Sequence, residues 1–498
     1  MKRIALFVLG LLSVQAVAQN INPGADEIYR EDEIAFIYLT MDSADSIALL
    51  DDIDIYSDEY LPTAFRFKNS LMDTTLEFNV GIRLRGNTSR GQPKRSLKIK
   101  FKEFDGSKFY GYKKFNLKAE NNDPSMAREM LTLQTFRNAN VPATRTQYAE
   151  VYINGGYMGL YLNVEQLDDE FVDSRFGNED GNLYKCEYGA TLEDDGQIYN
   201  NDIYELETNE DENNRSILEH FVDVLNNTPD EDFKTEIEKI FNVQPFLRYL
   251  AVEALVGHWD GYSYNQNNFY LYANPDNGLI EFMPYDVDNT FGMDWVGRDW
   301  GTRDVLDWPK HDQPRPLTKR ILAIDSYFYQ YTEELKNLLE TYFTETALFP
   351  EMDDLKEMIS DAIERDPYFP LTFGFTHQDF LDSYTVALGG DYGQLPYGLK
   401  PYVTIRSEIA AQNLEILGVQ HSLGSKISVY PNPSDGNGIE VKSEQAFNSV
   451  VIRDVLGHLI DFQINKISAR HYSIEFSLLP GIYVLTIDAK SHNFLVSN

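Results

Sequence analysis

The sequence has one cysteine, Cys186, among its 498 residues. A single cysteine cannot form an intramolecular disulfide, so the fold must be stabilised by buried apolar side chains. We expect Cys186 to be a small buried hydrophobic residue, which is more common than a nucleophilic cysteine. Beyond the N-terminus, no apolar run reaches the roughly 20 residues that a transmembrane helix needs. The sequence therefore predicts no membrane span.

Basic residues are also scarce. The chain has 43 Lys and Arg against 79 Asp and Glu, for a formal net charge of -36. Nucleic acids and anionic membranes are bound mainly through Lys and Arg, so this balance excludes nucleic acid as a partner. A large negative charge keeps a protein soluble and can draw calcium to its surface. The length is sufficient for several domains with substantial cores.

Several common catalytic motifs are missing. The sequence contains no G-x-S-x-G, no H-E-x-x-H among its eight histidines, and no G-x-G-x-x-G. These absences argue against the usual serine hydrolases, zinc proteases and glycine-rich nucleotide loops. A glycosidase carboxylate pair stays open, because acidic residues are too numerous for the sequence to single out two.

The N-terminal residues have the pattern of a secretory signal. Lys2 and Arg3 form a charged region, Ile4 to Val14 an apolar core, and Ala16-Val17-Ala18 a small-residue cleavage site. The apolar core is too short for a membrane anchor. We therefore expect residues 1–18 to direct Sec export and the remaining chain to be secreted.

One stretch, Leu255 to Gly292, concentrates carboxylates and amides around a predicted hairpin with strands at Phe269–Tyr272 and Leu279–Met283. Hard cations such as Mg²⁺ prefer these oxygen ligands. Phosphoryl transfer needs one Asp to orient the attacking hydroxyl, and an Asn and a second Asp to hold the metal on the phosphates. The polar residues at the mouths of the hairpin are Asp260, Asn265, Asn267, Asn268, Asp286 and Asp288.

The charge reverses locally between Arg83 and Phe101, where two predicted strands flank a loop rich in Gly, Ser and Thr. Such a loop can offer backbone N–H groups to phosphates, and Lys98 could add a point charge. A solvated strand face with an ordinary turn is the alternative. A helix predicted at Asp123–Asn138 carries Glu129, which could pair with Lys98 as the helix glutamate of protein kinases does. From spacing alone, a surface glutamate is the favoured interpretation.

The order of the predicted elements gives the fold class. Strands dominate to about residue 190 and helices dominate from Ser216 to Leu417, which predicts an α+β protein with a strand-rich N-terminal lobe and a helix-rich C-terminal lobe. The pattern changes near Gly418 to Ser425. Beyond this boundary, short alternating strands separated by Pro and Gly turns predict a small all-β sandwich at 425–498.

Five ordered pieces of the sequence resemble the CotH kinase family, named after spore coat protein H, over roughly Ile34 to Leu417. They are "GIRLRGNTSRGQPKRSLKIKF", "NNDPSMAREMLTLQTFR", "VYINGGYMGLYLNVEQLDDEF", "NNFYLY" and "FMPYDVDNTFG". The resemblance implies an atypical, two-lobed protein-kinase-like domain at residues 34–417. It also implies ATP and Mg²⁺ or Mn²⁺ as cofactors, and a secreted or surface protein as substrate.

The resemblance also implies roles for particular residues. Asp260 matches the catalytic-loop aspartate, in the H-x-D spacing that begins at His258. Asn268 matches the metal-binding asparagine because it precedes an aromatic strand, and Asn265, at the spacing of ordinary kinases, is the alternate. Asp286 matches the metal-binding aspartate, and Asp288 lies beside it.

For the phosphates, the resemblance favours Lys98 on the basic hairpin, with Lys94 and Arg85 as nearby candidates and Glu129 as the acidic partner. The chain departs from ordinary kinases in two respects. It lacks the glycine-rich loop, and the loop after Asp260 is extended.

Residues 425–498 resemble the type A C-terminal sorting domain of type IX secretion. The matching pieces are "VYPNPSDG", "VVIRDVLGHLI" and "LLPGIYVLTID". This resemblance implies the type IX secretion machinery as a partner. After Sec export, it would place the protein on the outer cell surface or outside the cell.

Three functions remain open from the sequence. The leading hypothesis is an exported kinase that phosphorylates a protein or small-molecule hydroxyl. The second is a catalytically inactive kinase-like module whose aromatic residues, 13% of the chain, line a groove for glycan or peptide. The third is a structural surface protein in which Asp286, Asp288 and Asp294 bind Ca²⁺.

Overall fold

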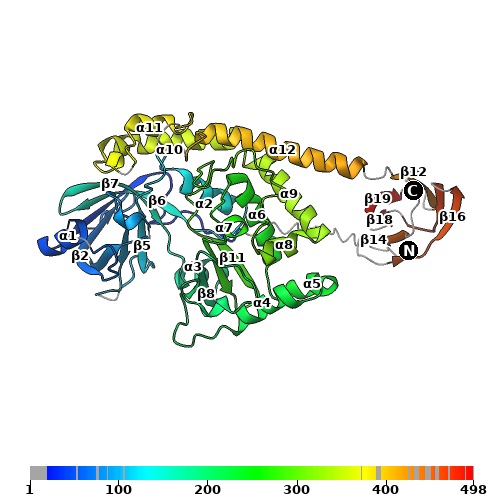
Figure 1. Ribbon diagram of the computed structural model, residues 1–498, viewed down its shortest axis with the longest axis horizontal. Coiled ribbons are helices and arrows are strands. Elements are labelled where there is room, and N and C mark those ends of the chain that lie inside the picture. The colour runs from blue at the N-terminus through cyan, green and yellow to red at the C-terminus, as the bar shows by residue number, and fades with distance from the viewer. Residues whose placement is uncertain are drawn as a thin grey trace, which may run out of the picture. The chain divides into compact units, whose positions relative to one another are not determined.

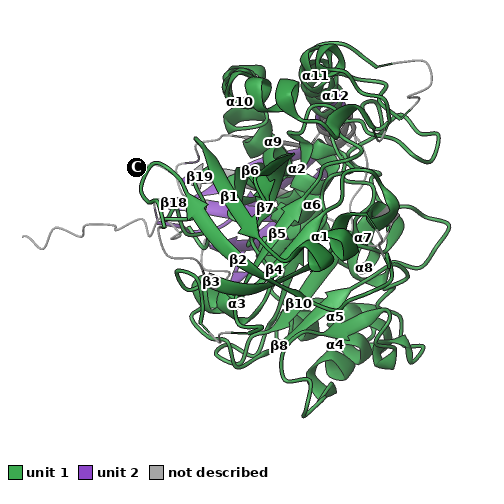
Figure 2. Ribbon diagram, turned by 90° about the vertical axis from the view of Figure 1, so that its left-hand side faces the viewer, with its two compact units in different colours: residues 1–411 green, residues 412–498 purple. Residues whose placement is uncertain are grey.

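A computed structural model describes residues 20–496 and leaves out positions 52–53, 75–77, 87, 105–106, 372, 389–393, 424–426, 431–433, 435–436, 444–449, 455–458, 469–470, 480 and 488–489. The predicted signal at residues 1–18 lies outside the described residues. The chain divides into two compact units, Met1–Ala411 and Gln412–Asn498, which are coloured separately in Figure 2. Helices and strands are mixed in the first unit, as the α+β prediction expected.

Seven strands of the first unit close into a barrel in the order β1-β2-β3-β4-β5-β7-β6. Neighbouring strands are antiparallel except β1 and β6, which are parallel. Closure leaves no exposed sheet edge. Alternate residues point inward, and they form a core rich in phenylalanine, including Phe65, Phe101 and Phe115. The barrel strands are β1 Ile34–Thr40, β2 Leu61–Lys68, β3 Phe78–Leu84, β4 Leu97–Lys100, β5 Lys114–Lys118, β6 Thr146–Ile153 and β7 Gly156–Val164.

A four-stranded sheet in the order β11-β10-β8-β9 follows in the same unit, surrounded by helices (Figure 1). Its strands are β8 Asn182–Cys186, β9 Tyr204–Leu206, β10 Phe269–Ala273 and β11 Ile280–Pro284. The α-helices of this unit are α1 Ser43–Leu50, α2 Arg128–Asn138, α3 Asp169–Phe176, α4 Ser216–Asn227, α5 Asp230–Ile237, α6 Val243–Val256, α7 Tyr262–Asn265, α8 Pro316–Leu322, α9 Asp325–Thr341, α10 Glu345–Arg365 and α11 His377–Asp382. Short 3-10 helices are η1 Thr88–Gly91, η2 Gln197–Tyr199 and η3 Phe369–Leu371.

Helix α6 links the barrel side of the unit to the β10–β11 hairpin. Its Tyr249 stacks on Phe136 of α2, with ring centroids 5.3 Å apart, and packs against Phe282 of β11 at 4.6 Å. Phe246 of α6 also contacts Phe282. Aromatic pairs of this kind are worth about 0.5–1.5 kcal/mol beyond the area they bury. The contacts fix α2 and the hairpin on the two sides of one buried helix.

Most predicted elements appear close to their expected places. The Asn154-Gly155-Gly156 turn signal predicts a hairpin, which is present as β6 and β7. The apolar residues at helical spacing before Gly257 predict a helix, which is present as α6. The helix predicted at Asp123–Asn138 is present as α2, but its predicted start is wrong, because α2 begins at Arg128. The Asp123 carboxylate accepts hydrogen bonds from the backbone N–H groups of Ser125, Ala127 and Arg128. Met126 has a φ of +58°, which no α-helix accommodates.

In the first unit, the strands β5 and β9 and the helices α3, α7 and α11 were not predicted. Each is short, and none carries an apolar pattern long enough to be read. Among these elements β5 matters most for the candidate site, because its last residue, Lys118, lies there.

In the second unit the described strands form two four-stranded sheets in the orders β12-β13-β17-β16 and β15-β14-β18-β19. Both sheets contribute to one hydrophobic cluster that includes Val441, Ile474, Ile452 and Leu485. The strands are β12 Ile427–Tyr430, β13 Gly438–Ser443, β14 Val450–Asp454, β15 Leu459–Ile460, β16 Gln463–Ser468, β17 His471–Glu475, β18 Gly481–Ile487 and β19 Lys490–Val496.

The predicted boundary at Gly418 to Ser425 falls near the end of helix α12, which runs from Leu399 to Leu423. The two units divide earlier, at Gln412, within this helix. Across the part of the chain that the structure describes, no helix combines the length and apolarity needed to cross a bilayer.

Candidate functional site

The β10–β11 hairpin and the loops around it bring Asp260, Asn268 and Asp286 together. Gly257 ends α6 in the left-handed conformation, with φ of +72°, and the chain then turns through Asp260 into α7. Phe269 pairs with Pro284 across the hairpin, and the N–H of Tyr285 donates to the carbonyl oxygen of Asn268 at 3.1 Å. The chain positions just before β10 and just after β11 therefore meet at the same end of the hairpin.

Amide side chains surround the carboxylate of Asp260. Its Oδ1 accepts from Asn265 at 2.5 Å and from Asn267 at 3.4 Å. Its Oδ2 accepts from Asn268 at 3.1 Å and from Asn289 at 3.4 Å. Asn268 adopts φ of +55°, a conformation that asparagine tolerates better than most residues. This arrangement fixes the orientation of the carboxylate.

Burial raises the pKa of Asp260 to about 6, although the hydrogen bonds from Asn265, Asn267 and Asn268 hold it down and the charge of Asp286 adds to the rise. A carboxylate whose pKa lies near the working pH is suited to accept a proton. By contrast, His258 is completely buried, and burial lowers its pKa to about 3. The imidazole of His258 is therefore neutral.

Lys118, the last residue of β5, connects two acidic side chains of the site. Its Nζ lies 2.5 Å from Oε2 of Glu129 on α2 and 2.5 Å from Oδ1 of Asp286. Burial opposes the charge on Lys118, but Asp286 and Glu129 outweigh burial and raise its pKa well above the usual range. Burial by itself would raise the pKa of Asp286. The charges of Lys118 and Arg85 outweigh burial and lower this pKa to about 2. Both ends of the ion pair are therefore charged at neutral pH.

The predicted pairing of Glu129 with Lys98 is wrong, because the ammonium group that pairs with Glu129 belongs to Lys118. Lys98 on β4 pairs in register with Asn116 of β5, two residues before Lys118. Burial, together with the charges of Lys114 and Arg85, lowers the pKa of Lys98 to about 7. One signal in the sequence could have identified Lys118: it ends a short alternating segment directly ahead of the helix that carries Glu129.

The other two predicted cations differ in their positions. Lys94 is 2% exposed, and its Nζ lies 2.6 Å from Asp366 and donates to the carbonyl oxygen of Leu160 at 2.5 Å. It therefore cannot reach a phosphate, and that prediction is wrong. Arg85 does lie beside the site, because its Nη2 donates to the hydroxyl of Tyr285 at 3.2 Å.

Two further acidic residues face this group. Burial and the charges of Asp286, Glu129 and Asp260 raise the pKa of Asp288 well above its usual range, although Lys118 opposes the rise. Burial and the charge of Glu129 do the same to Glu120. Sequence reasoning missed Glu120, which follows β5 by two residues.

The charges of the site fit a divalent cation. Its carboxyl groups are Glu120, Glu129, Asp260, Asp286 and Asp288, and its cations include Lys118, Arg85 and Lys185, which all lower the pKa of Asp286. Glu120 and Glu129 are buried and the other three are partly buried, and carboxylates in such an excess are stabilised by protonation or by a neutralising cation. Oxygen ligands from carboxylates and amides are those that Mg²⁺ and Mn²⁺ prefer. Asp286, Asn268 and Asp288 are the side chains that would hold one.

Asn289 ties Asp260 to Asp288, and sequence reasoning missed it. Its Nδ2 donates to Oδ1 of Asp288 at 3.0 Å as well as to Asp260. The indole N–H of Trp295 donates to Oδ1 of Asn289 at 2.9 Å, so the amide orientation is set from outside the site. Asn289 thus aligns the two carboxylates.

A model of the CotH kinase protein family matches residues 82–386, well over half of the chain. This chain belongs to the CotH kinase family. A second model, the secretion system C-terminal sorting domain, matches residues 428–496. These matches confirm both resemblances drawn from the sequence. The sorting domain indicates export by type IX secretion to the cell surface or outside.

Curated relatives of this CotH protein are distant. It is 27% identical to inner spore coat protein H of Bacillus subtilis over 321 residues, which cover 63% of this chain and 84% of that protein. It is 25% identical to invasin CotH2 of Rhizopus delemar over 339 residues, which cover 62% of this chain and 56% of the invasin. A match to spore coat protein homolog 1 of Rhizopus delemar is also 25% identical and covers 51% of that protein. The chain thus spans about half the length of these two fungal relatives.

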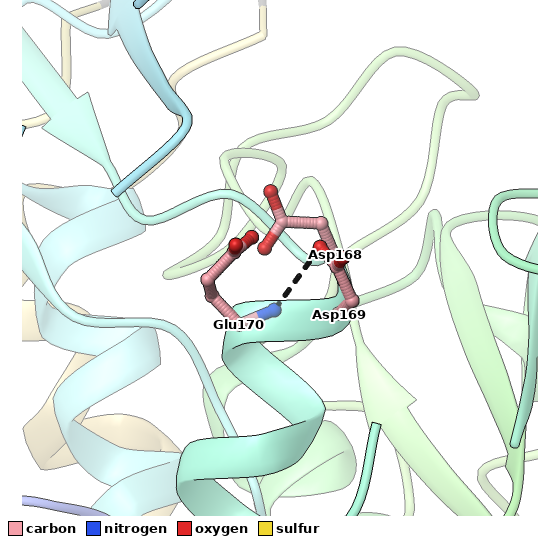
Figure 3. A group of neighbouring side chains, drawn as sticks. All are labelled: Asp168, Asp169 and Glu170. Carbon is pink, nitrogen blue, oxygen red and sulfur yellow. Dashed lines mark hydrogen bonds between the residues drawn. The ribbon is translucent and has the colours of Figure 1, made fainter. Parts of the chain in front are cut away.

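The CotH domain has a second acidic group on α3. In the part of the chain that the structure describes, Asp168, Asp169 and Glu170 are the carboxylates whose oxygen atoms all lie within 4.8 Å of one another (Figure 3). Lys113 contacts Asp169 and lies 2.9 Å from Glu170, and Lys108 lies 2.5 Å from Glu170. Asp168 caps α3 by accepting from the N–H of Phe171. Lysines and the helix terminus therefore account for this group without a metal.

The third hypothesis expected Asp294 of the CotH domain to join Asp286 and Asp288 in a calcium site. The structure does not bring the three carboxylates together. Oδ2 of Asp294 accepts from the backbone N–H groups of Gly297 and Arg298, and its Oδ1 accepts from the indole of Trp300 at 3.0 Å. These bonds occupy the carboxylate in shaping its own loop.

Proposed function

We propose that this protein is an exported atypical kinase that transfers the γ-phosphate of ATP to a hydroxyl group of a protein or small molecule. The observation that carries the proposal is the double ion pair of Lys118 with Glu129 and Asp286, beside an amide-held Asp260. Protein kinases need a strand lysine paired with a helix glutamate, a metal-binding aspartate and a catalytic-loop aspartate. These four residues occupy four separate elements here, and the fold brings them together.

Each residue of the site has a role in this proposal. Asp260 orients the acceptor hydroxyl and takes its proton, because its carboxylate is fixed and its pKa is near neutrality. Asn268 and Asp286 would hold the metal, with Asp288 and the alternate Asn265 beside them. Bound Mg²⁺ or Mn²⁺ would neutralise the phosphate charge. Catalysis then comes from positioning and charge neutralisation, with no covalent intermediate.

Lys118 takes the phosphate-binding role first expected of Lys98. Its Nζ lies between Glu129 and Asp286, where a phosphate next to the Asp286-bound metal would also lie. Arg85 directly follows β3, Lys98 lies on the neighbouring strand β4, and both would attract the nucleotide. The barrel corresponds to the N-terminal lobe of a kinase and the helical part to the C-terminal lobe.

The site of action is proposed to be outside the cell. The sorting domain supports type IX export, and we propose that it folds as a β-sandwich recognised by that machinery. The acceptor would then be a secreted or surface protein. Sec export before this step depends on residues 1–18 acting as a signal.

Titration with ATP in the presence of Mg²⁺ or Mn²⁺ tests the kinase proposal. We expect metal-dependent binding by calorimetry and phosphate transfer onto the protein itself or an added acceptor. Asp286→Asn should lose nucleotide binding. Asp260→Asn should keep it and lose transfer by a factor of roughly 10²–10⁴. Asp307→Asn, in an exposed loop, serves as the control.

Absence of metal-dependent nucleotide binding in the wild-type protein would contradict the kinase proposal. It would favour an inactive kinase-like surface module that binds glycan or peptide. A drop in melting temperature on chelation without nucleotide, together with no nucleotide binding, would favour the Ca²⁺-dependent structural protein.

A further inference from the structure

Trp295 is the exposed one of the four tryptophans in the chain. It is 45% exposed, whereas the other three, Trp259, Trp300 and Trp308, are at most 5% exposed. Val296 beside it is 47% exposed. Exposed apolar side chains that stand next to one another mark an interaction site more often than isolated ones do. The surface at Trp295 is therefore a candidate contact for a ligand of the site.

The loop that carries Trp295 is fixed against the loop of Asp260. The indole N–H of Trp259, directly before Asp260, donates to the carbonyl oxygen of Met293 at 2.8 Å. The ring of Trp259 also stacks on the buried ring of Trp300, with centroids 5.8 Å apart. Both ends of the loop are thus attached to the same residue, and the exposed indole between them is held beside the site.

Two hydrogen bonds connect Trp295 to Asp260. Its indole Nε1 donates to Oδ1 of Asn289 at 2.9 Å, and Nδ2 of Asn289 donates to Oδ2 of Asp260 at 3.4 Å. The first bond takes up the only polar atom of the indole, so the part of the ring that solvent reaches is apolar. A group that contacts this ring lies close to the carboxylate that would take the proton of the acceptor.

Phe373 extends the apolar surface from another segment of the chain. Its ring centroid lies 6.1 Å from that of Trp295, and the two planes are tilted by 46°. On the other side, Phe373 packs at 5.8 Å against Phe375, which is 1% exposed. The buried ring anchors Phe373, which is itself partly exposed. Two tilted rings offer a third apolar side chain contacts with both of them.

The separation of Trp295 from Asp260 suits a polypeptide acceptor. Two hydrogen bonds and one amide group lie between the indole and the carboxylate. An extended chain advances about 3.3 Å per residue, so about two residues cover this span. A free amino acid is too short to place its hydroxyl at Asp260 and an apolar group on the two rings at the same time.

We propose that Trp295 and Phe373 select a polypeptide acceptor by packing against an apolar side chain about two residues from the hydroxyl that Asp260 deprotonates. The inference rests on the proposed kinase function and adds the class of acceptor to it. Trp295 then has two roles: its ring contacts the acceptor, and its N–H group orients Asn289.

Fluorescence tests the contact without relying on activity. Because the other three tryptophans are buried, acrylamide quenching of tryptophan fluorescence reports mainly on Trp295. The probes are two synthetic peptides with one serine each. One peptide has phenylalanine two residues from the serine on both sides, and the other has alanine there. With Mg²⁺ and a non-hydrolysable ATP analogue present, we expect the Phe peptide to reduce quenching and the Ala peptide to leave it unchanged.

Variants of the two rings separate their roles in phosphate transfer. Phe373→Ala should raise KM for the Phe peptide by roughly three- to tenfold and leave kcat unchanged, because it removes a contact with the acceptor alone. Trp295→Phe keeps a ring but loses the bond to Asn289, so it should lower kcat for both peptides and keep the preference for the Phe peptide. Tyr329→Ala is the matched control, because Tyr329 is an aromatic residue of α9 that is 62% exposed.

The melting temperature of each variant checks that it folds. Equal transfer to the two peptides, with no change in quenching by either, would overturn the inference and leave the kinase proposal standing. Protection of Trp295 by an oligosaccharide and by neither peptide would overturn the choice of a polypeptide. Failure of the wild-type protein to bind nucleotide with Mg²⁺ or Mn²⁺ would overturn both the inference and the kinase proposal.

Discussion

Lys118 and Glu129 form a buried ion pair, Nζ to Oε2 at 2.5 Å, that joins the end of barrel strand β5 to helix α2. Their side chains are 9% and 2% exposed. Lys118 also reaches Asp286 from the segment after β11, so one ammonium group connects three elements. The pairing fixes the barrel and the hairpin in one geometry at the site.

Replacing Lys118 should damage both stability and nucleotide binding. Lys118→Met leaves Glu129 buried without its partner, which costs about 3–5 kcal/mol of unfolding free energy when a buried pair is broken. Denaturant unfolding measures this loss. Lys98→Met is the control: burial already disfavours the charge on Lys98, so this variant should be as stable as the wild type or more so. Equal stability of the Lys118 and Lys98 variants would contradict the assignment.

The pH dependence of Asp260 gives a second prediction. Its folded pKa of about 6 lies above the usual value, so its contribution to stability is fully present below about pH 4 and is lost as the pH rises through 6. Asp260→Asn should therefore gain stability relative to the wild type as the pH increases. We expect a gain of about 1–2 kcal/mol at pH 8, reduced by partial solvent exposure.

Thermal unfolding of both proteins at pH 4 and pH 8, in chelator and without nucleotide, measures this difference. Phosphate transfer by the wild type should rise through pH 6 as Asp260 loses its proton. A constant stability difference across this range would show that Asp260 does not titrate there.

The ion pair of Lys94 with Asp366 gives a prediction about stability alone. The two side chains are 2% and 0% exposed, and Asp366 also accepts from the N–H of Leu160. Asp366→Ala should cost about 3–5 kcal/mol, because Lys94 remains buried and unpaired. The folded variant should bind nucleotide normally.

Asp353→Ala is the matched control, since Asp353 pairs with Lys400 at the surface and is 61% exposed. Exposed pairs of this kind contribute about 1 kcal/mol or less. Denaturant unfolding measures the loss of unfolding free energy in Asp366→Ala and in Asp353→Ala. Similar losses would show that the buried pair contributes no more than the surface pair.

Removal of the sorting domain should separate export from activity. A chain ending at Leu423 keeps helix α12 and all residues of the proposed site. We expect it to remain inside the producing cell while its nucleotide affinity, measured on purified protein, stays within about twofold of the full chain. Secretion of the shortened chain, assayed by fractionation, would show that export does not need residues 424–498.

The sequence predicted the elements that have strong local patterns. Asn154 and Gly155 both adopt left-handed backbone conformations. The Asn-Gly pair is itself the sequence signal for such a turn, so it predicts the hairpin. The apolar spacing of α6 predicts that helix, and the carboxylates and amides around β10 and β11 could be listed in order. The sequence favours Lys98 because the basic hairpin stands out in an acidic chain. It does not point to Lys118, because β5 is short and was not predicted as a strand.

By itself, the sequence determined the CotH family, the sorting domain, the mixed α and β content and the oxygen-rich hairpin. These features depend on local spacing and on motifs that stay contiguous in the chain. Only the tertiary structure decided which lysine meets Glu129, that Lys94 is committed to Asp366, and that Asn289 and Glu120 face the site. Such choices depend on barrel closure and register, which bring distant residues together and which no local pattern encodes.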